Sequence, residues 1–384
     1  MNLLELNSRS QQIVKLLCTT AARGLADCYS LNTCPTAKHI SSDNHVRLSQ
    51  ASNLRYIIMA QIGIKRWLNS DSYNTPDDRT SLPDLWPHIS SESHRITGAG
   101  NLGLAIWASV QNNSADYITF TEKLVDNWAR LREACNAVEL AWVLQGLVRF
   151  SQHQPVTNKI ANVLDDVHNR LMDLYCRDNA LFARHNRSGL TEVISSRIAC
   201  FADQVYPILA LANYGRHFNN QQSIDTAAAV ADTICGLQGP DGQWWWQYDV
   251  KTGQVAEEYP VFSVHQDGMA PMALLAIDTV AGTNHTVYVE KGLAWLDKRN
   301  ELNVEMILPE QGIIYRDIHR REIGKMYRLV RGLLITAGWE TAHCLAGKNL
   351  FGYVLNRECR PYELGWILYA WADFHSNSSS RLGH

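Results

Sequence analysis

The sequence has 384 residues, of which 46% are hydrophobic and 19% are charged, and its formal net charge is −3. This is the composition of a globular protein with a large core, and the weak negative charge argues against a protein whose main partner is nucleic acid. Nine scattered cysteines without a Cys-x-x-Cys pair are typical of reduced thiols in a cytoplasmic protein. We expect no signal peptide, since an acidic residue comes early and no long apolar run follows. No stretch reaches the ~18–20 apolar residues of a membrane span.

Apolar residues recur at three- and four-residue spacing along most of the chain, which is the pattern of helices with a buried face. The predicted helices are Ser10–Ala26, Leu54–Trp67, Ala99–Val110, Ala115–Cys135, Val138–Phe150, Lys159–Tyr175, Asp203–Phe218, Ser223–Leu237, Gly268–Val280, Val287–Asp297, Lys325–Trp339 and Pro361–Phe374. Short β-like pieces occur at Trp244–Tyr248 and Gly312–Tyr315, without a strand–helix–strand series. The sequence therefore predicts an all-α fold with short β-like loops.

Five of these segments share one form, in which small or polar residues and one acid or amide precede a strongly apolar helix. The polar residues at their N-terminal ends are Asn101, Glu139, Asp203 with Gln204, Asp267 and Glu363. Such helices alternate with more amphipathic ones, which indicates an inner and an outer ring. We predict that residues 1–384 form a single α/α-toroid domain of six or seven helical hairpins. The N-terminal ends of the inner helices would meet at one mouth, where their dipoles face a ligand.

The stretch Leu237–Ala276 concentrates the chemistry of the chain. It carries three consecutive tryptophans followed by a tyrosine, and carboxylates and a histidine stand close behind them; these residues are Trp244, Trp245, Trp246, Tyr248, Asp249, Glu257, Glu258, Tyr259, His265 and Asp267. Three adjacent tryptophans cannot all face one core from a helix or a strand. We therefore expect the aromatic residues to form a stacking platform for a ring-shaped polar ligand.

Gln238, Gly242 and Trp244 form a Q-x3-G-x-W element, which resembles the repeat element of the squalene-cyclase and protein-prenyltransferase toroids. The run GPDGQWWWQYD before a helical hairpin resembles the substrate-side loops of α/α-toroid glycosidases, sugar epimerases and polysaccharide lyases. The resemblance implies a toroid that acts on a carbohydrate or an isoprenoid. The D-x-D-D motif of proton-initiated cyclases is absent, because Val163 and Leu164 precede Asp165 and Asp166. The zinc set of the prenyltransferases is not recognisable either, so we expect no metal and no cofactor.

Glycosidases need two carboxyl groups, about 5–5.5 Å apart for retention of configuration and about 6.5–9.5 Å apart for inversion. The first candidate is Asp267 as general acid or base with His265 as its partner, and Asp249 and Glu258 are further candidates. The alternative role for Asp267 is simple N-capping of the following helix. Tyr259 could serve as the base of an elimination. Further substrate contacts are expected from Asp203, Glu139 and Glu363, with Arg316 and Arg320 as a clamp for an anionic substituent.

The leading hypothesis is a carbohydrate-active enzyme, a glycoside hydrolase or a polysaccharide lyase, that acts on an oligo- or polysaccharide containing acidic sugars. One alternative is a terpene-cyclase-like or prenyltransferase-like enzyme that binds an isoprenoid diphosphate and stabilises carbocations with its aromatic rings. Another is a toroidal binding module without catalysis. The sequence leaves the oligomeric state open.

Overall fold

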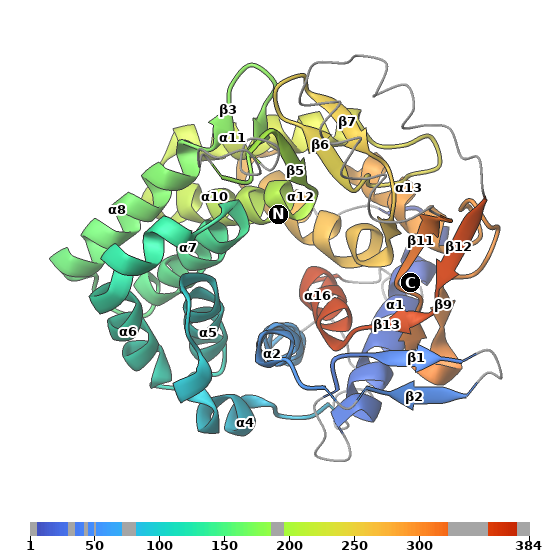
Figure 1. Cartoon of the computed structure of the whole chain (residues 1–384), viewed down its shortest axis with the longest axis horizontal. Coiled ribbons are helices and arrows are strands. Elements are labelled where there is room, and N and C mark those ends of the chain that lie inside the picture. The colour runs from blue at the N-terminus through green and yellow to red at the C-terminus, as the bar shows by residue number, and fades with distance from the viewer. Residues whose placement is uncertain are drawn as a thin grey trace, which may run out of the picture.

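The computed structural model describes residues 6–29, 35–41, 45–49, 51–70, 82–185, 196–321 and 352–374. These ranges contain twelve α-helices and several small sheets, and the helices form an α/α toroid (Figure 1). The prediction of a helical toroid with short strands is therefore confirmed. The predicted helix Lys325–Trp339 lies outside the described residues.

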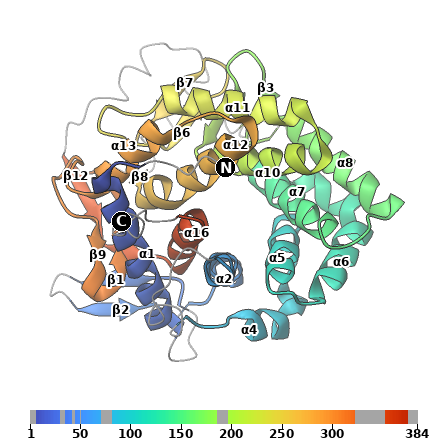
Figure 2. The ribbon, with the colours of Figure 1, turned by 180° about the vertical axis from the view of Figure 1, so that it is seen from behind.

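Six helices form the inner ring of the toroid, so the number of hairpins is at the lower end of the predicted range. They are α2 (Leu54–Leu68), α5 (Ala99–Gln111), α7 (Ala137–Ser151), α10 (Ala202–Phe218), α12 (Ala270–Ala281) and α16 (Pro361–Trp371). Each packs against the next in this order, and α16 packs against α2 to close the ring. The two opposite views of the molecule show this closed arrangement (Figures 1 and 2).

The outer helices differ from the inner ones in how they bury their surface. They are α1 (Ser8–Tyr29), α4 (Trp86–Ser91), α6 (Asp116–Leu131), α8 (Asn158–Met172), α11 (Gln221–Gly236) and α13 (Thr286–Leu296). Only five residues of α8 are buried, along one stripe, whereas α5 buries eleven of its thirteen residues. A helix that is apolar all round is stable only when neighbours cover every side, which is why the apolar helices form the inner ring.

Glycines allow neighbouring inner helices to approach closely, both where α16 closes the ring against α2 and between α5 and α7. A Cβ atom on Gly63 of α2 would lie 1.9 Å from the carbonyl oxygen of Gly365 on α16. A Cβ atom on Gly146 of α7 would lie 2.4 Å from the carbonyl oxygen of Gly103 on α5. These backbone contacts leave no room for a side chain, so glycine sets the helix–helix distance at both places.

The strands are more numerous than the two β-like pieces that the sequence indicates. Three antiparallel sheets have the orders β13-β1-β2, β5-β6-β7 and β12-β11-β8, and two hairpins pair β3 with β4 and β9 with β10. The bounds are β1 (Lys38–Ile40), β2 (Val46–Leu48), β3 (Tyr175–Cys176), β4 (Leu181–Phe182), β5 (Ile198–Cys200), β6 (Gln247–Asp249), β7 (Gln254–Glu257), β8 (Val261–Phe262), β9 (Ile307–Leu308), β10 (Ile313–Ile314), β11 (Asp317–Arg320), β12 (Tyr353–Asn356) and β13 (Glu358–Cys359). Strands β5, β8 and β13 directly precede inner helices, so the sheets gather at the mouth where those helices begin.

Shorter helical turns complete the fold. The 3-10 turns are η1 (Ser93–Arg95), η2 (Arg132–Ala134) and η4 (Pro309–Gln311), and a π-helical turn, η3 (His265–Met269), leads directly into α12. Among the described residues, no helix is both long and apolar enough to cross a membrane.

A buried histidine joins three helices at the far end of the α12 hairpin. The imidazole of His285 contacts Asp278 of α12 through Nδ1 at 2.5 Å and Asp232 of α11 through Nε2 at 3.0 Å. Burial by itself would lower the pKa of His285, but the hydrogen bonds and charges of Asp278 and Asp232 raise it above its ordinary value. The charged imidazole therefore links the start of α13 to its two neighbours.

We expect this link to make the protein more stable at mildly acidic pH than at alkaline pH. Because the folded pKa of His285 is raised, its stabilisation is complete below the unfolded pKa of ~6.5 and is lost as the pH rises through the folded pKa. The loss should amount to about 1.5–3 kcal/mol, the net value of a hydrogen bond to a charged group. Urea unfolding of His285→Gln between pH 5.5 and 9 should show a flatter profile than the unmodified protein. His153→Gln, at an exposed histidine, should leave the profile unchanged; equal flattening in both variants would contradict the assignment.

Candidate functional site

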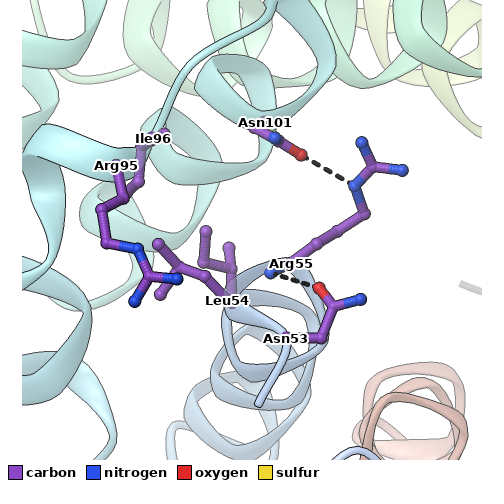
Figure 3. A pocket seen from close by; sticks show the side chains of 7 residues that line it. Asn53, Leu54, Arg55, Arg95, Ile96 and Asn101 are labelled. Carbon is purple, nitrogen blue, oxygen red and sulfur yellow. Dashed lines mark hydrogen bonds between the residues drawn. The ribbon is translucent and has the colours of Figure 1, made fainter. Parts of the chain in front are cut away.

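The N-terminal ends of the inner helices form one mouth of the toroid. A pocket of about 360 Å³ opens there between the starts of α2 and α5, and Asn53, Arg55, Arg95 and Asn101 are among its lining residues (Figure 3). The Arg55 Nε atom donates to Asn101 Oδ1 at 2.7 Å across the two helices. Polar side chains at other inner-helix starts continue the site around the mouth.

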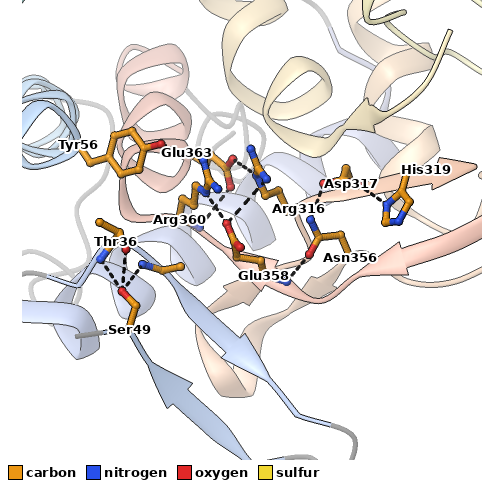
Figure 4. A network of polar contacts seen from close by, with 11 residues as sticks. Thr36, Ser49, Tyr56, Arg316, Asp317, His319, Asn356, Glu358, Arg360 and Glu363 are labelled. Carbon is orange, nitrogen blue, oxygen red and sulfur yellow. Dashed lines mark hydrogen bonds and ion pairs between the residues drawn. The ribbon is translucent and has the colours of Figure 1, made fainter. Parts of the chain in front are cut away.

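Glu363 is the carboxylate at the start of α16, and the local sequence places it there. Pro361 begins the helix, as proline favours, and Glu363 Oε2 accepts from the backbone N–H of Arg360 at 3.2 Å. Arg316 Nε donates to Glu363 Oε1 at 3.3 Å (Figure 4). Burial raises the pKa of Glu363 to about 7, against the opposing charges of Arg316 and Arg360. This carboxyl can therefore gain or lose a proton near neutral pH, as general acid–base catalysis requires.

Asp267 lies inside the π-helical turn η3, and π-turns within helices are frequent at functional sites. Its side chain is 1% exposed, and among the described residues Oδ1 has no hydrogen-bond partner. Burial, with the nearby charge of Glu363, raises the pKa of Asp267 well above its ordinary value. Trp371 of α16 donates to the backbone carbonyl of Asp267 at 2.7 Å and holds the turn in place. The alternative of simple N-capping does not fit, since Asp267 stands inside the helical turn and caps no helix start.

Asp267 and Glu363 thus form a coupled pair of buried carboxyl groups. Each resists ionisation because of burial, and the charge on one disfavours charge on the other. Such a pair takes up and releases protons as a unit. Burial favours the protonated form of Asp267, and the pKa of Glu363 lies at about 7. Two carboxyl groups with raised pKa values are a combination that acid–base catalysis uses.

His265 begins the same π-turn, but it does not provide a base at neutral pH. Burial lowers the pKa of His265 to about 3, although its hydrogen bond to the backbone of Trp244 opposes that shift. The ring lies 4.5 Å from the ring of Phe201 and 5.1 Å from that of Phe262, measured between centroids. Its Nδ1 atom has no partner among the described residues. The lowered pKa favours the neutral imidazole, so His265 as the predicted partner of Asp267 would act as a hydrogen-bonding group.

Asp203 at the start of α10 is a third buried carboxyl, with no exposed surface. Its Oδ2 atom accepts from the backbone N–H of Cys200 at 2.8 Å and from the Cys200 thiol at 3.0 Å. Burial raises its pKa despite the opposing charge of Arg184. Glu139 closes a capping box with Asn136, because its Oε2 atom accepts from the Asn136 backbone N–H at 3.3 Å, and Glu363 closes one with Arg360 in the same way. The helix start accounts for the position of Glu139.

The tryptophan run is mostly core, which corrects the predicted stacking platform. Trp244 and Tyr248 have no exposed surface, and Trp245 is 8% exposed, whereas Trp246 is partly exposed. The reason is the turn at Gly242, which has φ +93° and lies so close to α13 that a Cβ atom would be 2.1 Å from the carbonyl oxygen of Lys291. A loop pressed onto the outer helix directs the first indoles into the protein.

Three further predicted catalytic residues have partners that explain their positions. Arg197 binds Asp249 through two hydrogen bonds, of 2.8 and 2.6 Å, on neighbouring strands β5 and β6. Arg320 pairs with Glu258 and lies 4.6 Å from the Tyr259 ring centroid, so it is not a free clamp. The hydroxyl of Tyr259 donates to Glu301 at 2.8 Å. Asp249, Glu258, Tyr259 and Arg320 thus stabilise sheets and loops around the mouth.

We expect Asp249→Asn to destabilise the fold without changing the chemistry. Removing this carboxylate breaks the ion pair and the paired hydrogen bonds between Asp249 and Arg197, which is 13% exposed. Breaking a largely buried ion pair should lower the free energy of unfolding by about 3 kcal/mol. Urea unfolding measures that loss, and kcat per folded molecule should be unchanged. Unchanged stability together with a large fall in kcat would indicate that Asp249 is a catalytic residue.

The sequence did not single out several aromatic residues of the mouth. The Tyr56 and Tyr362 rings lie 4.5 Å apart, and the Trp142 and Tyr206 rings lie 5.3 Å apart. Arg360 donates to the Tyr56 hydroxyl at 2.9 Å. Each ring lies in the first two turns of an inner helix. An aromatic residue at that position is the sequence signal that could have identified these residues as part of the mouth.

The sequence matches no protein-family model and no curated protein. Solved structures with a similar fold include an unsaturated glucuronyl hydrolase from Streptococcus agalactiae, with a TM-score of 0.58, 13% identity, and coverage of 98% of this chain and 94% of that chain. A glycosyl hydrolase of family 88 from Bacteroides vulgatus has a TM-score of 0.54 and 10% identity over 94% of this chain and 98% of that one. A structure described as a possible member of family 105 from Klebsiella pneumoniae has a TM-score of 0.57 and 10% identity over 97% and 94%. At these identities the likeness establishes the fold.

Proposed function

We propose that this protein is a carbohydrate-active enzyme that acts on a saccharide containing a uronic acid. The observation that carries the proposal is the pair of Asp267 and Glu363 at the mouth of the toroid, where burial raises the pKa of Glu363 to about 7. The structural likeness to unsaturated glucuronyl hydrolases supports the substrate class. So does the complex of a Streptococcus agalactiae variant with dGlcA-GalNAc6S, which has 12% identity, a TM-score of 0.58 and coverage of 98% of this chain and 94% of that chain.

In the proposed reaction, the protonated Asp267 donates its proton to the saccharide as the bond to the leaving group breaks. Glu363, in its ionised form, accepts a proton from the attacking water. Arg316 holds Glu363 by the hydrogen bond to Oε1 and favours its charged form. His265 remains neutral and is available as a hydrogen-bonding group for a sugar hydroxyl. Each proton movement starts from a group whose protonation at neutral pH suits its role.

Elimination would use the same base but form a different product. The direction of the change in ultraviolet absorbance separates the two reactions. Elimination creates a C=C bond conjugated with the uronate carboxylate, so ultraviolet absorbance rises. Hydrolytic removal of an already unsaturated uronate consumes that bond, so absorbance falls. Hydrolysis of a saturated glycoside releases a reducing end without either change. The full chain should be tested on oligosaccharides that end in saturated and in unsaturated uronic acids, with prenyl diphosphates in parallel.

The isoprenoid alternative has less support in the arrangement of the aromatic residues. Trp107, Trp366 and Tyr369 are fully buried and pack on one another, with centroid separations of 5.2–5.8 Å. These rings fill space between inner helices, whereas the mouth carries the carboxyl groups. Turnover of a prenyl diphosphate, with every acidic saccharide left unchanged, would reverse this preference.

Asp267→Asn tests the assignment of the proton donor within the proposed function. The asparagine keeps the size of the side chain but cannot supply the proton, so we expect kcat to fall about 100-fold or more. His265→Ala removes a neutral contact and should act mainly on KM. If Asp267→Asn retains full kcat on a substrate that the unmodified chain turns over, the donor is another group. Circular dichroism and urea unfolding check that each variant is folded.

A further inference from the structure

The pocket between the starts of α2 and α5 has basic and amide side chains, and none of its described lining residues is acidic. We propose that this pocket binds an anionic substituent, a sulfate ester or a second carboxylate, on the sugar next to the one that reacts. The inference rests on the proposed function, because it assigns a subsite for the same acidic saccharide. The pocket volume of about 360 Å³ lies at the small end of the ~300–1,000 Å³ of ligand sites.

Arg55 is held in place by neutral groups. Its Nε atom donates to Asn101 Oδ1 at 2.7 Å (Figure 3). Its guanidinium carbon lies 5.3 Å from the Trp142 ring centroid. Among the described residues, no carboxylate forms an ion pair with Arg55. The two terminal guanidinium nitrogens can therefore offer a fork of donors to an oxyanion, whose geometry matches such a fork.

The other polar groups of the pocket favour an anion as well. Asn53 Oδ1 accepts from the Arg55 backbone N–H at 3.1 Å, which leaves the amide NH2 of Asn53 as a donor. Helix α5 starts after Gly98 without a side-chain cap, so its first N–H groups keep their positive potential. The oxygen of Asn101 is already taken by Arg55. The donor groups left over thus outnumber the acceptors.

Arg95 provides a second cation that can turn toward a ligand. It pairs with Glu92 at 2.7 Å, but its side chain is 62% exposed. An exposed pair of this kind contributes little to stability, so an anion in the pocket can compete for the guanidinium. Arg95 also comes from η1 and not from α2, so the two arginines approach the pocket from different elements.

Ring contacts connect this pocket to the start of α16, the inner helix that packs directly against α2. Arg55 lies over Trp142, the Trp142 and Tyr206 centroids are 5.3 Å apart, and Tyr206 lies 6.0 Å from Trp366. Trp366 stands three residues after Glu363 on α16. Helices α2 and α16 are neighbours in the ring, and the Tyr56 and Tyr362 ring centroids lie 4.5 Å apart. An anion bound by Arg55 therefore lies beside the carboxyl pair, which suits a substituent on a neighbouring sugar.

The test measures binding of a uronate-containing disaccharide in sulfated, unsulfated and doubly carboxylated forms. Calorimetric titrations of the full-length Glu363→Gln variant avoid turnover, and inorganic sulfate is titrated separately. We expect the sulfated or the doubly carboxylated form to bind about 10-fold more tightly than the unsulfated one, as charged hydrogen bonds allow. Arg55→Gln and Arg95→Gln should each remove most of that preference. Arg130→Gln, at an exposed arginine of the outer helix α6, should keep it.

The outcomes separate the inference from the proposed function. If disaccharides bind and Arg55→Gln and Arg95→Gln leave the preference for the charged form unchanged, the inference is overturned and the proposed function stands. If no saccharide binds while inorganic sulfate binds and loses affinity in Arg55→Gln, the saccharide assignment is overturned for both, and a free anion site remains. The form that gains affinity, sulfate ester or second carboxylate, identifies the substituent. Urea unfolding of each variant excludes misfolding as the cause of lost binding.

Discussion

Glu363→Gln is expected to lower kcat by about 100- to 10,000-fold, the usual contribution of a general acid or base. The glutamine keeps the hydrogen bond from Arg316 but cannot accept a proton. Burial raises the pKa of Glu363 to about 7, with Arg316 and Arg360 opposing the shift. The base must be ionised, so kcat of the unmodified protein should rise with pH through about 7. The residual activity of Glu363→Gln should not show this rise with pH.

Glu310→Gln is the matched control, because Glu310 is a carboxylate at the surface, with 83% of its side chain exposed in a pair with Arg23. Glu310→Gln should have the same kcat as the unmodified protein and the same rise of kcat with pH. A rate that falls through pH 7 would instead make Glu363 the proton donor and Asp267 its partner. Unchanged kcat in Glu363→Gln would remove Glu363 from the reaction altogether.

The second large effect is expected on stability, at the contact that closes the ring. Gly63→Ala would place a Cβ atom 1.9 Å from the carbonyl oxygen and 2.5 Å from the carbonyl carbon of Gly365. Both atoms belong to the backbone of α16, so no side chain can rotate away and the helices must separate. We expect the free energy of unfolding to fall by about 3 kcal/mol, at the upper end for overpacking, although alanine gains ~1 kcal/mol in helix propensity.

Gly236→Ala provides the control, because Gly236 is also helical but has no other atom within 4 Å of the added Cβ. It should leave stability unchanged or raise it by up to ~1 kcal/mol. Guanidinium unfolding of the two variants, followed by circular dichroism, measures the contrast. Equal stability of Gly63→Ala and the unmodified protein would mean that α2 and α16 are not in close backbone contact, and the closed ring would be wrong.

Local sequence patterns predicted the helices well because burial follows periodicity. The apolar segments after Asn101, Glu139, Asp203, Asp267 and Glu363 are all inner helices, and the alternation with amphipathic helices predicted two rings. The sheets were largely missed, since strands of two to four residues are too short to show alternation. The same patterns could not show which of the polar residues at the helix starts has a raised pKa. Glu139 and Glu363 look alike in sequence, yet Glu363 has a raised pKa and faces Arg316.

The aromatic loop was the place where sequence reasoning failed most clearly. Three tryptophans beside carboxylates resemble a ligand platform. Whether each ring is buried or exposed, however, depends on the contact between Gly242 and α13, two segments that are far apart along the chain. Asp249 and Glu258 were candidates for the same reason, and their partners Arg197 and Arg320 come from other strands. Whether a carboxylate has a structural or a catalytic role depends on the side chains that contact it. Those contacts are set by the tertiary fold.

By itself, therefore, the sequence determined a helical toroid whose inner helices begin with polar residues, because the period of the apolar residues requires two rings and helix starts attract polar groups. It also singled out Asp267 as a candidate, through its position before an apolar helix. Only the tertiary structure decided that burial raises the pKa values of Asp267 and Glu363, that burial lowers the pKa of His265 and that Trp244 is buried. Protonation and exposure depend on the burial and charges that distant segments bring together, and these quantities arise when the ring closes.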